Sequence, residues 1–397
     1  MKFAIDTDLL SETITAAISS LPARPTSPVL GGVLIEAGIG AVTMSSFNYD
    51  RATKRTAAAI DVAEPDTAVV SGRLLSAIGS NLPRNKDATV DVSGSEMVIT
   101  AGRTAFRLPL LHAEDYPELP IMQPEEDTIG TVDGDEFAEA VQVIGALASS
   151  EEQPANLTGI NLAFTPNGLW LCATDRYIVG RRRLNWTGTT EGQTLVPAAD
   201  LLATIKAVAG PVSENVEILL RNKSMFGLRT PATTVMTSCL GEEFPPMEQV
   251  LKPAVYTSMS TVPTAELADM LRRASSIADD GNAQIDIEVD AGGLSVTTTK
   301  SATGKVNDSI GAEHQGAYRR VALSARRLNS ALSIVDDPEV TLGFRATGHL
   351  VGIHPGSLQR TDDEVDLLAC NNFALLIGIR RSVTTMPETQ HEMEAPA

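Results

Sequence analysis

The chain has 397 residues, of which 43% are hydrophobic and 20% are charged, a composition typical of globular proteins and not of disordered or fibrous ones. Lysine and arginine number 31 against 50 aspartates and glutamates, so the net charge of −19 excludes a basic outer surface that wraps DNA. Aromatic residues make up only 4% of the chain, which disfavours a protein that stacks unpaired bases on rings.

Amphipathic helix patterns recur along the chain in three pairs. The first helix of each pair is predicted at 8–14, 135–141 and 265–271. The second helix is predicted to begin at Ser71, Pro197 and Ser324, because serine is a good N-cap and proline suits the first helical turn. Corresponding helices lie about 128 residues apart, which predicts three repeats of one unit.

Between these helices, short runs of alternating apolar and polar residues predict antiparallel strands. The clearest runs, bounded by glycine or asparagine, are 29–37, 42–47, 157–164, 169–174, 285–289 and 294–298, with a further hairpin at 88–92 and 97–100. Each repeat therefore reads as helix, strands, helix, strands. This order predicts an α+β fold of three repeated domains, each with two helices backed by antiparallel sheets.

Two connectors separate the repeats. Residues 114–120 and 242–246 combine acids, an aromatic residue and prolines, and such a composition is incompatible with a continuing helix. We therefore predict domains at 1–120, 128–250 and 254–381. The polar residues 382–397 are predicted to form a disordered tail.

The three cysteines, Cys172, Cys239 and Cys370, lack the spacing of a zinc site or a disulfide framework, and we expect free thiols in a reducing compartment. The sequence shows neither the apolar core of a signal peptide nor a run long enough to cross a bilayer. We therefore expect a cytoplasmic protein without membrane contacts.

Motifs for catalysis are missing from the sequence. Of the five histidines, only His349 and His354 lie close together, at a spacing that fits no zinc-binding helix, and we predict surface loop residues. Gly38 and Gly40 lie between two strands and lack the third glycine of a dinucleotide-binding turn. The chain is therefore predicted not to be an enzyme, with no catalytic residue, metal or cofactor.

Seven short motifs together resemble the bacterial DNA polymerase III β subunit, the sliding clamp, in its actinobacterial or phage-borne form. The motifs follow the order of that family and span all three repeats; they are Leu21-Pro22-Ala23-Arg24-Pro25, 70–75, 114–117, 157–160, Ala173-Thr174-Asp175-Arg176-Tyr177, 244–245 and 375–380. The resemblance implies a head-to-tail homodimer whose six domains close a ring around duplex DNA. Such a ring holds a polymerase on DNA without chemistry of its own.

The resemblance also implies which residues meet DNA. In this family the helices line the hole of the ring, and a loop near the first helix lies at its face. By position, the DNA-binding residues would be Arg24, Arg73, Lys206, Arg272, Arg273, Arg326 and Arg327. The alternative for each helical cation is an ordinary solvated helix face. The first helices of repeats one and two carry acids and no lysine or arginine, so the expected lining is sparsely basic.

A second implied site is a hydrophobic pocket between repeats two and three that takes short peptides from polymerases, the clamp loader and repair proteins. The matching positions are Leu157, Thr174, Arg176, Tyr177, Ile178, Val179, Pro245, Val250, Leu375, Ile377, Gly378 and Ile379. The alternative interpretation is that these are core strand residues. The family usually has Arg-Leu where this chain has Ile178-Val179, which predicts an altered peptide preference.

For the dimer contact, Phe106 and Leu108 match the family's edge strand. The opposing helix has Ser275 and Ser276 where bulky apolar residues are expected, with Ile277 as the substitute. The leading hypothesis is a processivity clamp for a replicative DNA polymerase. The alternative is a clamp-like decoy or scaffold that binds partner peptides without supporting replication.

Overall fold

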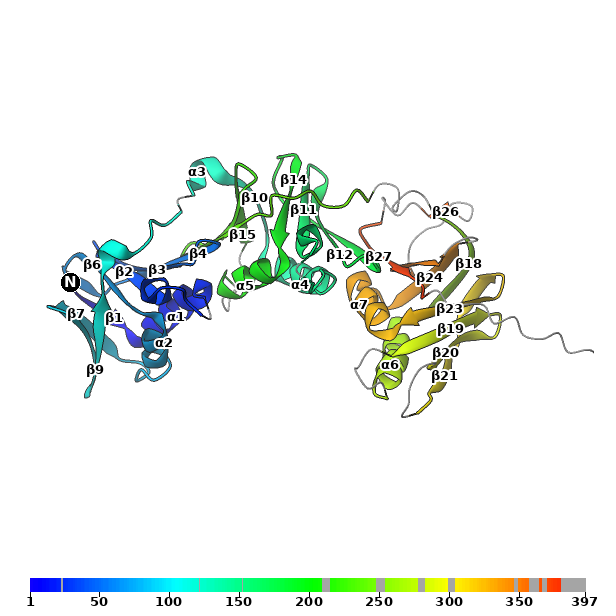
Figure 1. The fold of residues 1–397 in the computed structure, drawn as a ribbon, viewed down its shortest axis with the longest axis horizontal. Helices are drawn as coiled ribbons and strands as arrows, with labels where there is room; N and C mark the ends of the chain where they lie inside the picture. Colours follow the sequence, from blue (N-terminus) through cyan, green and yellow to red (C-terminus); the bar gives the residue numbers. More distant parts are fainter. Residues whose placement is uncertain are drawn as a thin grey trace, which may run out of the picture. The chain divides into compact units, whose positions relative to one another are not determined.

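The structure is a computed structural model that describes residues 1–22, 24–120, 122–151, 153–208, 215–247, 254–277, 283–298, 304–345, 349–356, 364–365 and 370–379. It forms two compact units (Figure 1). The first unit is Met1–Lys252 with Asn371–Phe373, and the second contains the rest of the chain. The predicted tail at 382–397 lies outside the described residues.

The first repeat opens the first unit, and its helices coincide with the predicted ones. Its elements are β1 (Lys2–Asp6), α1 (Thr7–Ala17), η1 (Ile18–Ser20), η2 (Pro28–Gly31), β2 (Gly32–Gly38), β3 (Ala41–Phe47), β4 (Arg51–Ala58), β5 (Asp61–Glu64), β6 (Asp66–Ser71), α2 (Gly72–Gly79), β7 (Asp87–Ser93), β8 (Glu96–Ala101), β9 (Thr104–Leu111) and η3 (Ala113–Asp115).

The second repeat completes the first unit in the same order. Its elements are α3 (Pro124–Asp127), β10 (Thr128–Asp133), α4 (Gly134–Gly145), η4 (Ala155–Leu157), β11 (Gly159–Thr165), β12 (Gly168–Thr174), β13 (Ile178–Leu184), β14 (Gly192–Pro197), α5 (Ala198–Val208), β15 (Asn215–Arg221), β16 (Met225–Arg229) and β17 (Thr233–Ser238).

The third repeat makes up the second unit, except that the start of its last strand falls in Asn371–Phe373 of the first unit. Its elements are β18 (Ala254–Pro263), α6 (Thr264–Ser275), β19 (Gln284–Asp290), β20 (Gly293–Thr298), β21 (Asn307–Ile310), β22 (Glu313–Gly316), β23 (Arg319–Ser324), α7 (Ala325–Val335), β24 (Glu339–Arg345), β25 (Leu350–Pro355), β26 (Glu364–Val365) and β27 (Asn372–Ile377). The three-repeat α+β fold with antiparallel sheets is thereby confirmed.

The helices form where the sequence pattern places them because each buries one apolar stripe. In α1, Leu10 and Ile14 are one turn apart and at most 1% exposed. The aspartate before the helix caps it: Asp6 Oδ1 accepts hydrogen bonds from the amides of Asp8 and Leu9 at 2.9 and 3.0 Å. Asp133 caps α4 in the same way, so the first helices of repeats one and two both begin after an aspartate N-cap.

Some local predictions differ from the structure. The strand expected from Val29 begins at Gly32, because Pro28 opens the short 3-10 turn η2. Ser71 stands at the N-cap of α2 without a side-chain cap bond, and Pro197 ends β14 instead of entering α5. The surface prediction for His354 is wrong, because this residue lies in β25, is 1% exposed and stacks on the ring of Tyr256.

Two sheets build the first unit. One runs β10-β15-β16-β17-β4-β3-β2-β6-β9-β8-β7-β1-β5 and therefore passes from the second repeat into the first. The crossing point is the antiparallel ladder between β4 and β17, in which Arg51 to Arg55 pair with Thr237 to Thr233. The unit's remaining strands lie side by side in a second sheet, in the order β14-β11-β12-β13. The first two repeats are thus joined by backbone hydrogen bonds as well as by side chains.

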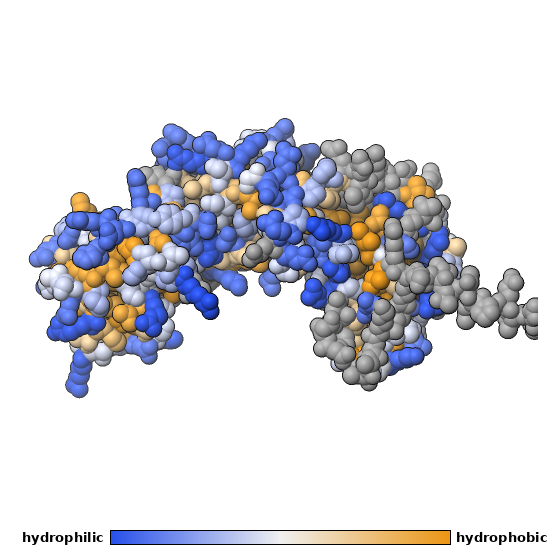
Figure 2. Space-filling model, in the orientation of Figure 1, coloured by the Kyte–Doolittle hydropathy of each residue, from blue (hydrophilic) through white to orange (hydrophobic). Residues whose placement is uncertain are grey.

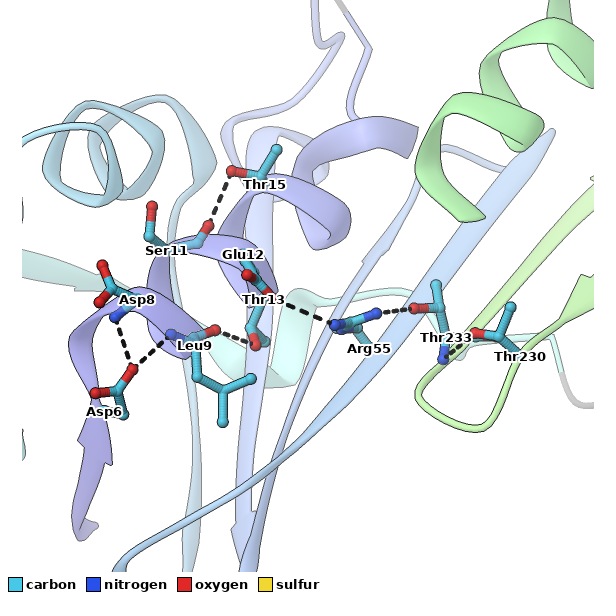
Figure 3. A network of polar contacts seen from close by, with 10 residues as sticks. All are labelled: Asp6, Asp8, Leu9, Ser11, Glu12, Thr13, Thr15, Arg55, Thr230 and Thr233. Carbon is cyan, nitrogen blue, oxygen red and sulfur yellow. Dashed lines mark hydrogen bonds and ion pairs between the residues drawn. The ribbon is translucent and has the colours of Figure 1, made fainter. Parts of the chain in front are cut away.

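Apolar packing and polar contacts reinforce that ladder. A small buried cluster gathers Phe47 and Ala52 from the first repeat with Leu219 and Met236 from the second. Arg55 reaches across the junction, donating from Nη1 to Thr233 Oγ1 at 2.7 Å while its Nη2 lies 3.8 Å from Glu12 of α1 (Figure 3).

The ladder also fixes where helices lie. Helix α1 packs on β3 and β4, while α5 packs on β16 and β17 and contacts α1 itself (Figure 1). Because the two helices contact each other over neighbouring strands of one sheet, they cover the same face of it. The first unit therefore presents helices from two repeats side by side.

In the second unit, strands run in the order β27-β25-β24-β18-β22, with β26 also on β18, and a second sheet runs β21-β20-β19-β23. Helices α6 and α7 contact each other, as the paired helices of the other repeats do. Cross-strand neighbours Gly343 and Gly352 leave a slot for the Tyr256 ring, since a Cβ on Gly352 would lie 1.9 Å from the tyrosine hydroxyl.

A buried hydroxyl contact at the repeat junction offers a test of this fold. Thr53 of β4 is fully buried, and its Oγ1 lies 2.6 Å from Ser20 Oγ and 3.0 Å from Ser19 Oγ. Replacing Thr53→Val leaves the buried Ser20 hydroxyl without this partner, so we expect a loss of about 1–3 kcal/mol in unfolding free energy. Both tryptophans, Trp170 and Trp186, lie in the first unit, so their fluorescence during denaturant titration reports its unfolding.

The matched control is Thr43→Val, which removes the contact of Thr43 Oγ1 with Thr56 Oγ1 at 3.0 Å between β3 and β4. Thr43 is only half-buried, so water can replace that bond and the change should stay within about 0.5 kcal/mol. Equal effects of the two substitutions would contradict the role given to the junction.

Candidate nucleic-acid and peptide-binding surfaces

The cations predicted to meet DNA lie on loops and helices of both units, and most are exposed. Arg24 precedes η2, while Arg73 and Lys206 lie on α2 and α5 of the first unit. The second unit brings four arginines onto its two contacting helices: Arg272, Arg273, Arg326 and Arg327. Of all seven cations, only Arg327 is half-buried.

The two arginines of α6 are engaged within their own unit. Arg272 pairs with Asp269 one turn earlier, and Arg273 donates from Nε to Asp308 of β21 at 2.7 Å. Both lie in the last turn of the helix, where a positive charge stabilises the helix dipole. These contacts give Arg272 and Arg273 a structural role independent of any ligand.

Acidic side chains occupy the first helices of repeats one and two. Helix α4 carries Asp135, Glu136 and Glu139 and no cation, and α1 likewise carries only acids. Arg182 of β13, whose side chain is 9% exposed, donates to Glu139 at 3.0 Å and offsets one of these charges. A nucleic acid beside these helices would therefore meet few positive charges.

A tightly braced turn carries the central part of the predicted peptide site. Thr174 Oγ1 donates to the carbonyl of Ile178 at 2.7 Å, and Asp175 Oδ1 accepts from the amides of Tyr177 and Ile178, both at 2.9 Å. Arg176 adopts the left-handed region with φ of 77°. These hydrogen bonds fix the backbone of the turn, and Tyr177 at its tip is 55% exposed.

The other predicted pocket residues of the first unit are largely buried. Leu157, Thr174, Ile178 and Val179 are each 3–6% exposed, which matches the alternative interpretation of core strand residues. Pro245 is half-buried. Val250 lies outside the described residues. Within this unit, the exposed part of the predicted site is the Arg176–Tyr177 tip of the turn.

The remaining pocket residues belong to the end of β27 in the second unit. Leu375 is buried, whereas Ile377 is 44% exposed. The amides of Gly378 and Ile379 donate to the carbonyls of His349 and Ala322 at 2.5 and 2.7 Å. A Cβ at Gly378 would lie 2.8 Å from Val321 Cγ2, so this close approach requires glycine. The segment thus holds Ile377 at the surface by backbone contacts.

At the outer end of the first repeat, a hollow of about 540 Å³ opens between α2 and β9. Phe106, Arg107 and Leu108 line one side, and Leu74, Ala77, Ile78 and Asn81 of the α2 region line the other. Figure 2 shows apolar surface on the visible face of this repeat. Among the described strands, residues 104–109 of β9 pair with β8 alone, so their other backbone edge is open there.

The opposing predicted contact lies at the end of α6. Ser275 closes the helix, Ser276 is exposed, and Ile277 is half-buried directly after them. The apolar group available at this helix end is therefore Ile277.

Sequence reasoning missed the contribution of α2 to the hollow. Leu74 and Ile78 are one turn apart; Ile78 packs partly against the core beside Leu75, whereas Leu74 is 38% exposed. An exposed leucine beside the buried stripe was the available signal. Among the described residues, no group of three or more His, Cys, Asp or Glu side chains could hold a metal ion.

The cysteine prediction is confirmed for the thiol state: all three are free, with Cys172 and Cys370 buried and Cys239 half-buried. Burial raises the pKa of Cys172 to about 12, against the opposing charge of Arg181. The Arg181 guanidinium stacks 3.5 Å from the centre of the Trp170 ring.

The described part of the chain contains no helix long and apolar enough to span a membrane.

Models of one known protein family match all three repeats of the chain. The DNA polymerase III beta subunit family models match in order: the N-terminal domain at residues 1–120, the central domain at 131–246 and the C-terminal domain at 249–361.

Individual proteins similar to this chain also carry sliding-clamp names. A beta sliding clamp of Streptomyces coelicolor is 30% identical over 351 residues, covering 87% of this chain and 91% of the relative. The beta sliding clamp homolog GriR of Streptomyces muensis is 29% identical, with coverage of 87% and 92%. The DNA polymerase sliding clamp of Bacillus subtilis shares the fold with a TM-score of 0.86 at 21% identity, over 96% of this chain and all of that one. The chain belongs to the DNA polymerase III beta subunit family of sliding clamps.

Proposed function

We propose that this protein is a DNA-encircling sliding clamp that gives processivity to a replicative DNA polymerase and docks partner peptides. The observation that carries the proposal is the presence of all three domains of the family, in order, in one chain. In this proposal the protein acts in the cytoplasm, needs no cofactor and catalyses no reaction. Its partners are duplex DNA, a second copy of itself, and polymerases, clamp loaders and repair proteins.

In the proposed ring, the α2–β9 hollow of one protomer receives the end of α6 of its partner. The apolar lining of the hollow supports this, because Leu74, Ile78 and Phe106 would gain burial and Ile277 would find apolar neighbours. The open edge of β9 could pair with a strand of the partner, which would also remove an exposed edge. Two such contacts, related by symmetry, close a head-to-tail ring.

A charge placed in the hollow tests the dimer. The wild-type chain should sediment at about twice its monomer mass of 42.0 kDa at micromolar concentration. Phe106→Asp should shift it to monomer, because a carboxylate would be desolvated in the interface. Leu74→Asp, on the opposite wall and 38% exposed, is expected to act likewise with less disturbance of the fold.

The control for this experiment is Ile39→Asp, at a fully exposed apolar residue of the same repeat outside the hollow. It should leave the dimer intact. A monomeric wild-type chain, or a dimer unaffected by both hollow variants, would contradict the proposed interface.

The proposed peptide site combines the exposed tip of the Thr174–Ile178 turn with the end of β27. Tyr177 and Ile377 are the exposed large apolar side chains at these two places, at 55% and 44%. An extended peptide anchored by one or two bulky side chains needs such apolar contacts. Because Ile178 and Val179 are buried, we expect Tyr177 to contribute more contact area than either.

A double substitution tests this site. Tyr177→Ala with Ile377→Ala should weaken binding of a fluorescent clamp-binding peptide from the cognate polymerase at least tenfold, measured by anisotropy. The matched control, Tyr318→Ala with Ile60→Ala, also removes one exposed tyrosine and one exposed isoleucine and should leave affinity unchanged. Equal affinities of the two double variants would remove the assignment, provided that both remain dimeric.

A clamp-like decoy or scaffold remains the second candidate. It draws support from the altered pocket sequence and the sparsely basic helices. The match to the protein named beta sliding clamp homolog GriR does not favour the decoy hypothesis. The chain is 29% identical to that homolog and 30% identical to the Streptomyces coelicolor clamp, so the two matches do not separate the hypotheses. The clamp and decoy hypotheses differ in whether the protein stays on circular duplex DNA after it has been loaded.

A further inference from the structure

The turn between β3 and β4 in the first repeat has the same hydrogen bonds as the Thr174–Ile178 turn of the second repeat. Asn48 Oδ1 accepts from the amides of Asp50 and Arg51 at 3.1 and 2.6 Å, as Asp175 Oδ1 accepts from the amides two and three residues after it. The Asn48 amide donates to the carbonyl of Arg51 at 3.0 Å, and the Asp175 amide donates to that of Ile178 at 3.3 Å. The two repeats therefore brace their turns in one way.

Tyr49 occupies the tip of the β3–β4 turn, in a backbone conformation that glycine and asparagine adopt more readily. Its φ is 73°, in the left-handed region, and Arg176 has a φ of 77° at the same position of the other turn. The Tyr49 ring lies 5.3 Å, between centroids, from the ring of buried Phe47, yet Tyr49 is 64% exposed. A strained residue thus holds an aromatic ring mostly in solvent, a combination that is common at functional sites.

Carboxylates lie close to this turn. Asp50 directly follows Tyr49 and is exposed. Arg51 Nε lies 3.4 Å from Asp200 Oδ1 of α5, and these two side chains are 15% and 30% exposed. Burial raises the pKa of Asp200, Arg51 lowers it, and the nearby charge of Asp50 raises it. Because Arg51 pairs with Asp200, the ion pairs of the described residues leave Asp50 without a cation.

We propose that the β3–β4 turn, residues 47–51, is a second docking surface, which takes a peptide segment of a partner protein with a lysine or arginine beside an apolar side chain. The face of the Tyr49 ring attracts a cation, and its edge offers apolar contact. Asp50 supplies the complementary charge. The Thr174–Ile178 turn displays Arg176 beside Tyr177, so the two turns present a tyrosine beside opposite charges and select different peptides.

This inference goes beyond the proposed function, because a surface at 47–51 requires neither a closed ring nor DNA. The comparison of the two turns does rest on the proposed peptide site. The experiment therefore has to separate binding at the β3–β4 turn from binding at the peptide site.

A cationic photoprobe tests the surface on the full-length chain at about 0.15 M salt. The probe is a synthetic pentapeptide in which lysine and arginine flank the photoreactive residue benzoylphenylalanine, between two terminal glycines. Mass spectrometry locates the cross-links, and titration gives the half-saturating probe concentration. In the wild type we expect cross-links within 47–51.

Two substitutions remove the proposed contacts one at a time. Tyr49→Asn removes the ring and Asp50→Asn the charge, and each should raise the half-saturating concentration at 47–51 at least about threefold. The matched controls are Tyr318→Asn, at a tyrosine that is 53% exposed and also close to acids, and Asp61→Asn, at an exposed acid of the first repeat. Both should stay within about 1.5-fold of wild type.

Tyr49→Asn also separates binding from folding. Asparagine tolerates the left-handed region, so this variant should unfold at the same denaturant concentration as wild type or at a higher one. A Tyr49→Asn variant that unfolds at lower denaturant and still captures the probe like wild type would overturn the inference, since the tyrosine would then serve the fold. Cross-links absent from 47–51, or equal effects of Tyr49→Asn and Tyr318→Asn, would overturn it as well.

The double variant Tyr177→Ala with Ile377→Ala distinguishes the two surfaces. It should lose the polymerase peptide and keep wild-type capture of the cationic probe. Loss of the probe in this variant would place the probe at the peptide site and overturn the inference. A wild-type chain that captures the probe at 47–51 without binding the polymerase peptide would remove the peptide site and support the second surface.

Discussion

The backbone ladder between β4 and β17 is the contact on which the rest of the first unit depends. Because Arg51 to Arg55 pair with Thr237 to Thr233, one continuous sheet runs through two repeats, and α1 and α5, which contact each other, cover the same face of it. A hinge made only of side chains would leave these helices free to rotate against each other. A ladder with buried apolar residues and the Arg55 bridge holds them in one surface instead. For a protein that surrounds a duplex, a rigid wall of helices is the main structural requirement.

The charge of the molecule limits how strongly it can bind DNA. With a net charge of −19, the molecule is repelled by DNA at long range, so affinity must come from a few placed cations. Two of the predicted DNA-binding residues are already engaged by the fold, because Arg272 and Arg273 pair with aspartates. The other exposed candidates are Arg24, Arg73, Lys206 and Arg326. A topological link to DNA would make weak contacts sufficient, because the ring cannot diffuse away while it stays closed.

Periodic features were the ones that sequence reasoning predicted well. The buried stripes of α1 and α4 and the hairpins β7–β8 and β19–β20 follow from local patterns, and the repeat length follows from their recurrence. Contacts between residues distant in sequence were not predictable in this way. Arg55 and Thr233 meet only because β4 and β17 pair, and His354 is buried because Tyr256 stacks on it. At the peptide site, alternation could not separate displayed residues from core residues: Tyr177 is exposed by the braced turn, while its neighbour Ile178 is buried.

Sliding-clamp function means that the protein is linked to DNA by topology and not by affinity. The most direct test loads the protein onto nicked circular duplex with its clamp loader, isolates the complex by gel filtration at high salt, and then linearises the DNA with a restriction enzyme. A closed ring should remain on the circle and leave within seconds to minutes of linearisation. A protein that does not stay on the intact circle, or that remains equally bound after the DNA is cut, would contradict the account and favour a decoy or scaffold.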